Sequence, residues 1–220
     1  MFPAGVRRRK QSIQRDVRLL RLLNNILTSR IQRGNKNDAV REGEDGRYET
    51  PSAYELQRLM WKHSGTSAHL NEVRPRIYIG DMWAAKDKQT LQSHHITHVL
   101  NAADGKFNVC TGASFYRDTG IAYFGVEAFD MPSFDMSPFF YSAAKFMKDA
   151  MSNPTARVFV HCAMGLSRSS TLVLAYLMIH EHMTLAEAIT AVSEHRNICP
   201  NSGFLEQLRK LDQQLHCLGK

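Results

Sequence analysis

The chain has 220 residues, of which 43% are hydrophobic and 22% are charged, a composition typical of a globular domain. That length accommodates one domain with a full core and a terminal extension. No apolar run reaches the about 18 residues that span a bilayer, and no apolar core follows the basic N-terminal cluster, so the sequence predicts neither a transmembrane helix nor a secretory signal.

The formal net charge of +7 is concentrated at the N-terminus. Residues 1–40 hold ten lysines and arginines against two aspartates, whereas the other 180 residues hold 18 basic against 19 acidic side chains. Because the larger part of the chain is nearly neutral, we expect no nucleic-acid-binding face on the folded domain.

Residues 1–50 are expected to form a basic extension and linker, partly helical or disordered. Apolar residues recur at three- and four-residue steps from Ile13 to Ile31, which would give a helix one apolar and one arginine-rich face. A loosely packed extension, a mitochondrial transit segment, a membrane-surface helix and a nuclear-entry patch all remain open. We expect a cytoplasmic protein and leave nuclear or mitochondrial delivery through this segment open.

The folded domain is expected over residues 51–217, with Ser52 capping the first helix and Glu55 three positions later. Residues 63–70 are expected to be a polar loop. Strands are predicted over residues 76–80, 98–103, 122–127 and 157–161, and helices over residues 53–61, 88–94, 138–151, 171–179, 184–194 and 204–215. This alternation predicts a single α/β domain with a central, mainly parallel sheet of about five strands flanked by helices.

One strand–loop–helix segment carries the chemistry. A β-branched run ends at His161 and Cys162, a short loop containing Gly165 follows, and a long apolar helix begins after Arg168. The N–H groups of such a loop and the positive end of a helix can bind an anion, and the same surroundings lower a thiol pKa. A cysteine here can also be a small buried hydrophobe, but the coincidence of these residue types favours a nucleophile beneath a phosphate ester.

The run His161-Cys-Ala-Met-Gly-Leu-Ser-Arg-Ser169 resembles the signature loop of the cysteine-dependent protein phosphatases, and its neutral interior resembles the dual-specificity branch. Residues 71–75, 97–101 and 200–205 resemble the atypical, small members of that family, and the chain is most similar to the testis- and skeletal-muscle type. The likeness covers residues 52–215. One departure is Arg74, where those relatives usually have Trp.

A cysteinyl-phosphate mechanism needs a thiolate, an oxyanion site, an acid for the leaving oxygen and activation of water. Cys162 and Arg168 fit the first two, and Ser169 can hydrogen-bond the thiolate or cap the following helix. The residues alone leave Asp130 and Asp135 open as the acid; the family resemblance implies Asp130, near the start of its loop. The residues expected at the phosphate are His161, Cys162, Ala163, Met164, Gly165, Leu166, Ser167 and Arg168.

The expected substrates are phosphoproteins. The loop interior, residues 163–167, has no lysine or arginine, which counts against polyphosphoinositides. The resemblance implies action on phosphotyrosine and on phosphoserine or phosphothreonine, with MAP kinases as candidate partners by family analogy only. A phosphoprotein-binding scaffold and a lipid or RNA phosphatase remain alternatives. No cofactor is expected, and His94, His95 and His98 lack a cysteine at ligand spacing, so no metal is expected either.

Overall fold

In a computed structural model of the chain, residues 48–62, 65–105 and 108–217 are described. The chain divides into two compact units, Met1–Ala39 and Val40–Lys220, and every described residue belongs to the second. The predicted extension over residues 1–50 therefore lies outside the described residues except for its last three, and it stays a prediction.

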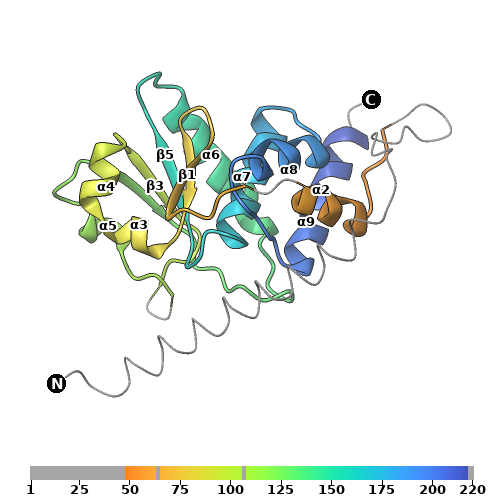
Figure 1. Ribbon diagram of the computed structural model, residues 1–220, viewed down its shortest axis with the longest axis horizontal. Coiled ribbons are helices and arrows are strands. Elements are labelled where there is room, and N and C mark those ends of the chain that lie inside the picture. Colours follow the sequence, from red (N-terminus) through yellow and green to blue (C-terminus); the bar gives the residue numbers. More distant parts are fainter. Residues whose placement is uncertain (1–47, 63–64, 106–107, 218–220) are drawn as a thin grey trace, which may run out of the picture. The chain divides into compact units, whose positions relative to one another are not determined.

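A five-stranded sheet forms the centre of the second unit (Figure 1). Its order is β1-β2-β5-β3-β4, and β1 alone is antiparallel to its neighbour. The strands are β1 (Leu70–Arg74), β2 (Ile77–Gly80), β3 (His98–Asn101), β4 (Ala122–Gly125) and β5 (Val158–His161). The prediction of a mainly parallel α/β sheet is confirmed.

Strand β1 was not predicted, and the predicted loop over residues 63–70 overlaps it only at Leu70, where the strand begins. Only Val73 of its five residues is buried, so the strand has neither the alternation nor the apolar run that marks a strand in a sequence. Arg76, with a φ of 68°, lies in the turn that reverses the chain into β2.

Two layers of helices cover the sheet. Side chains of Tyr78, Val99 and Phe159 face one layer, and those of Ile79, Leu100 and Val160 belong to the larger core on the other face. The first layer contains α3 (Met82–Lys86), α4 (Lys88–Ser93) and α5 (Gly112–Phe115); the second contains α2 (Ala53–Lys62), α6 (Phe140–Met151), α7 (Arg168–His180), α8 (Leu185–Ser193) and α9 (Ser202–Cys217), with the 3-10 turn η1 (Ser137–Phe139) before α6.

The predicted helices correspond to α2, α4, α6, α7, α8 and α9, with ends that differ by at most three residues. The short helices α3 and α5 were not predicted, because four or five residues carry too little periodicity. Helix α7 is buried from Arg168 to Met178, and after its polar first turn the residues 172–178 are apolar on all sides, as burial all round requires. Along the described part of the chain, no helix combines the length and the apolar character needed to cross a membrane.

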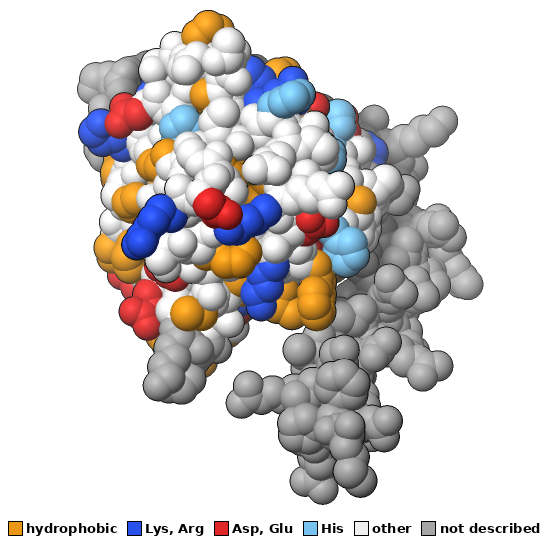
Figure 2. All heavy atoms as spheres, turned by 90° about the vertical axis from the view of Figure 1, so that its left-hand side faces the viewer, with side chains coloured by type: hydrophobic (Ala, Val, Ile, Leu, Met, Phe, Trp, Pro, Cys, Tyr) orange, Lys and Arg blue, Asp and Glu red, His pale blue; other side chains and the backbone are white. Residues whose placement is uncertain are grey.

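Figure 2 views the molecule from the side on which α4 and α5 lie in Figure 1. Basic, acidic and histidine side chains are interspersed on this face, without a concentrated field of one sign. This pattern follows from the near balance of charge over the residues after the first forty.

Arg74 packs at the far end of the sheet's edge strand. Its Nη2 donates to Glu181 Oε2 at 3.0 Å, and both side chains are about one third exposed or less. Glu181 follows directly after α7. The residue that departs from the family pattern thus joins β1 to the C-terminal end of α7, whereas Cys162 precedes the N-terminal end of that helix.

The register of the sheet determines where the functional site lies. His161, the last residue of β5, is opposite Gly80 at the end of β2 and opposite Asn101 at the end of β3. Three parallel strands therefore end at the same level, and Cys162 is the next residue along the central one. This is the edge at which open parallel sheets bind their ligands.

A buried carboxylate joins the start of the domain to its last two helices. Asp212 of α9 is fully buried, and its Oδ2 accepts hydrogen bonds from Tyr48 at 2.7 Å and Thr50 at 2.5 Å. Its Oδ1 accepts the backbone N–H of Leu185, the first residue of α8, at 2.8 Å. The predicted helix start is confirmed next to it, since the backbone N–H of Ser52 donates to a Glu55 carboxylate at 2.9 Å.

Replacing Asp212 by Ala is expected to lower the free energy of unfolding by about 2–4 kcal/mol, because buried donors lose their acceptor. Urea denaturation measures the change. The matched control is Asp149→Ala, which removes an exposed carboxylate paired with Lys145 and should change the stability by less than about 0.5 kcal/mol. Equal midpoints for the two variants would contradict a structural role for the Asp212 network.

Candidate active site

The loop between β5 and α7 is shaped by Gly165. Its φ of 69° lies in the left-handed region, and a Cβ there would meet the Gly80 carbonyl and the Arg196 guanidinium. Glycine therefore permits both the turn of the loop and its close approach to the end of β2.

Every carbonyl of residues 163–167 is hydrogen-bonded to a group outside the loop. The donors are Met82 N to Ala163 O (3.1 Å), Arg196 Nη2 to Met164 O (3.2 Å), Arg196 Nε to Gly165 O (2.8 Å), Cys199 N to Leu166 O (2.7 Å) and Thr171 N to Ser167 O (2.9 Å). Across a trans peptide, the C=O of one residue and the N–H of the next point in opposite directions. The N–H groups of residues 164–168 therefore turn the other way and form a concave anion site.

Arg196 is the main support of this loop and was not predicted from the sequence. It is 2% exposed, and besides the two loop carbonyls its Nη1 donates to Ala68 O at 2.7 Å and to Asn71 Oδ1 at 2.6 Å. It lies 34 residues after Cys162, just beyond α8. A single arginine after a helix gives no signal in the sequence, since its function depends on tertiary contacts.

Cys162 lies at the base of the concave site and is 1% exposed. Its Sγ accepts the Gly165 N–H at 3.2 Å and lies 3.4 Å from Ser169 Oγ. Burial alone would raise the pKa of this thiol, but the Arg168 guanidinium and hydrogen bonds from Ser169 and the Met164 amide outweigh it, so the pKa lies below its ordinary value. The arrangement stabilises a thiolate.

His161 packs beneath the loop as a neutral group. Burial lowers the pKa of this fully buried imidazole to about 4. Its ring stacks on Phe159 with centroids 5.4 Å apart, and its Nδ1 lies 3.3 Å from the Cys162 carbonyl oxygen. Through this nitrogen the imidazole contacts the first peptide of the loop.

Arg168, the first residue of α7, is 6% exposed. Its Nη1 donates to the Ala128 carbonyl at 3.1 Å and to Asn108 Oδ1 at 3.3 Å. Its buried Nε has no hydrogen-bond partner among the described residues and lies 3.6 Å from Asp130 Oδ2. A buried cationic N–H beside inward-facing amides fits an anionic ligand.

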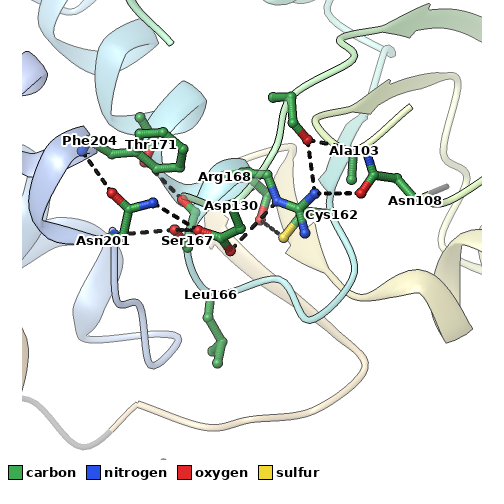
Figure 3. Close-up of polar contacts among 12 residues, drawn as sticks. Ala103, Asn108, Asp130, Cys162, Leu166, Ser167, Arg168, Thr171, Asn201 and Phe204 are labelled. Atoms are coloured by element: carbon green, nitrogen blue, oxygen red, sulfur yellow. Dashed lines mark hydrogen bonds and ion pairs between the residues drawn. The ribbon is translucent and has the colours of Figure 1, made fainter. Parts of the chain in front are cut away.

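The structure brings Asp130 to the loop (Figure 3). Its Oδ1 accepts hydrogen bonds from Ser167 Oγ at 2.7 Å and from Asn201 Nδ2 at 3.0 Å. Asp135, the other candidate acid, accepts the backbone N–H and hydroxyl of Ser137 within its own turn. The two aspartates that the sequence leaves open thus have different surroundings, and Asp130 is the one beside Arg168.

Asn108 and Asn201 also contact the site and were not predicted as site residues. Both reach it from loops, Asn108 after β3 and Asn201 just before α9. The only signal in the sequence was the resemblance of residues 200–205 to the family, which gave Asn201 no function.

Comparisons with known proteins agree with this geometry. Residues 77–214 match the family described as dual specificity phosphatase, catalytic domain. Dual specificity protein phosphatase 13B is 54% identical to the chain in Mus musculus and 55% identical in Homo sapiens, over 169 residues that cover 76% of this chain and 85% of each relative.

Two solved structures resemble the fold. Human DUSP28 superposes with a TM-score of 0.60 at 28% identity, covering 69% of this chain and 98% of that chain. A mouse putative dual specificity phosphatase complexed with zinc tungstate also has a TM-score of 0.60, at 29% identity, covering 70% of this chain and 95% of that one. The matched residues, the sheet and the loop after β5 lead to one conclusion: this chain belongs to the dual-specificity protein phosphatases and is a protein phosphatase.

Proposed function

We propose that the protein hydrolyses phosphotyrosine and phosphoserine or phosphothreonine in proteins through a cysteinyl-phosphate intermediate. The observation that carries this proposal is the concave set of N–H groups above a buried thiol whose pKa is lowered, with the Arg168 Nε beside it, which makes no hydrogen bond to any described residue. These groups match a phosphate dianion in shape and charge.

In the first step, Cys162 Sγ forms a bond to phosphorus while the bond from phosphorus to the side-chain oxygen breaks. The loop N–H groups and Arg168 stabilise the charge on the three equatorial oxygens. Asp130 donates a proton to the leaving oxygen, which departs as a neutral hydroxyl group.

In the second step, water attacks phosphorus and the S–P bond breaks. The Asp130 carboxylate accepts a proton from the water, so that the acid of the first step becomes the base of the second. Ser169 Oγ, 3.4 Å from Sγ, stabilises the departing thiolate. Inorganic phosphate leaves and the enzyme returns to its starting state.

Protein-bound phosphate is the substrate class that the loop favours. Apart from Arg168, the side chains of residues 163–168 carry no cation that would bind the additional phosphates of a polyphosphoinositide. MAP kinases are candidate partners by family analogy alone. A cytoplasmic location stays a prediction. Nuclear or mitochondrial delivery through residues 1–50 stays one as well, since most of these residues lie outside the described ones.

The direct test is Cys162→Ser, which should lower kcat by at least about 10³-fold because a serine hydroxyl stays protonated and is a far weaker nucleophile than a thiolate. Initial rates are measured on phosphotyrosyl and phosphothreonyl peptides. Vanadate should inhibit the wild-type protein and a metal chelator should not. Wild-type turnover by Cys162→Ser would end the proposal, and slow turnover with tight binding by the intact protein would favour a scaffold.

The lowered pKa of Cys162 predicts that its alkylation sets in at lower pH than that of an ordinary thiol. Iodoacetate modification, followed by mass spectrometry at this residue, should be half-maximal below the pH of half-maximal modification of an unperturbed cysteine. Arg168→Ala removes a cation that favours the thiolate, so its midpoint should move to higher pH. A wild-type midpoint at or above the ordinary value, or one that Arg168→Ala leaves in place, would contradict the electrostatic argument.

Asp130→Ala should slow turnover by about 10²–10⁴-fold, because a general acid contributes that much, and should leave phosphate binding intact. The variant should therefore retain phosphopeptide in a pull-down. Asp135→Ala is the matched control, with near wild-type kcat expected. The reverse result, with Asp135→Ala slow and Asp130→Ala fast, would reassign the acid.

A further inference from the structure

Asn201 uses both ends of its side-chain amide and its backbone, and the proposed mechanism accounts for none of these contacts (Figure 3). Its Nδ2 donates to Asp130 Oδ1 at 3.0 Å, and its backbone N–H donates to Ser167 Oγ at 3.2 Å. Ser167 in turn donates its hydroxyl proton to the same Asp130 oxygen at 2.7 Å. Asn201 therefore reaches Asp130 both directly and through Ser167.

These contacts make the two oxygens of Asp130 unequal. Oδ1 accepts two hydrogen bonds, from Ser167 and Asn201, whereas Oδ2 lies 3.6 Å from Arg168 Nε. An oxygen that accepts from two donors is the poorer place for a proton. The proton of the acid is therefore directed to Oδ2, the oxygen on the side of the guanidinium that binds the phosphate.

The loop that carries Asp130 makes backbone hydrogen bonds within itself, such as Met131 N–H to the Phe129 carbonyl at 2.9 Å. Residues 129–133 are all exposed and include no helix or strand. The start of α9 contacts this loop at a second point, because a Cβ on Gly203 would collide with the Pro132 carbonyl. The segment 201–203 therefore lies directly against the loop that carries Asp130.

We propose that Asn201 is a positioning residue for the general acid, holding Asp130 Oδ2 toward the leaving oxygen through its own Nδ2 and through Ser167. This inference rests on the proposed function of Asp130. A competing explanation is that Asn201 only caps α9, since its Oδ1 accepts the Phe204 backbone N–H at 3.0 Å. That acceptor also fixes which end of the amide is oxygen, so the donor faces Asp130.

Two variants separate the cap from the acid. Asn201→Asp keeps an acceptor for the Phe204 N–H and loses the donor to Asp130. Asn201→Ser also keeps a capping oxygen and adds no charge, but its side chain is too short to reach Asp130. Asn197→Asp is the matched control: it makes the same change four residues earlier, where the amide donates to Ser67 Oγ at 3.2 Å.

The readout is the dependence of rate on the leaving group. An alkoxide leaves far less readily than a nitrophenolate, so a misplaced acid slows phosphothreonyl peptides much more than 4-nitrophenyl phosphate. Both Asn201 variants should lose about 10-fold or more in kcat/KM on the peptide and less than about threefold on the aryl ester, part of the 10²–10⁴ that a general acid supplies. Vanadate affinity should stay within about twofold, since the phosphate loop is unchanged. Asn197→Asp should match the wild type on both substrates.

A double-mutant cycle completes the test. In an Asp130→Ala background, Asn201→Ser should cause no further loss, because its effect passes through Asp130. Equal losses on the two substrates, or full additivity with Asp130→Ala, would overturn the proposal and leave Asn201 as a cap. If Asp130→Ala itself shows no dependence on the leaving group, the assignment of Asp130 fails instead, which distinguishes the two failures.

Discussion

A planar peptide cannot turn its N–H toward a ligand without turning its carbonyl away, and this constraint shapes the whole site. For five successive peptides to face a phosphate, five carbonyls need donors on the outer side of the loop. Those donors come from the start of α3, from Arg196 after α8, from the segment before α9 and from the first turn of α7. The anion site is therefore a property of the assembled fold, and the loop residues alone do not specify it.

Burial of the Arg168 guanidinium is tolerated because it has fixed polar partners. It donates hydrogen bonds to the Ala128 carbonyl and to Asn108, and Asp130 lies on its other side. Cys162, as a thiolate, supplies negative charge at the base of the same site. The charges are thus paired before any ligand arrives, which limits the desolvation cost of a buried guanidinium. It also keeps the guanidinium in place for the phosphate oxygens.

A site residue could be predicted from the sequence where its role depends on its neighbours along the chain. The strand–loop–helix around Cys162 is local, so its composition and spacing predicted both the anion site and the thiol at its base. The site residues that were missed, Arg196, Asn108 and Asn201, reach Gly165, Arg168 and Asp130 across 31–71 positions of the chain and follow no periodic pattern. Strand β1 was missed because it is a half-exposed edge. The start of α7 was predicted three residues late, because Arg168 and the two serines after it are polar but buried by the site they build.

Ser167 connects the two halves of the chemistry. Its carbonyl is part of the set that turns the loop amides inward, and its hydroxyl joins Asn201 to Asp130. Any displacement of the loop at this residue would therefore move the phosphate site and the carboxylate together. By contrast, Ala163, Met164 and Leu166 are partly exposed, and their side chains make no hydrogen bond. In the proposed mechanism the backbone at these positions binds the phosphate, so their side chains can vary without disturbing the anion site.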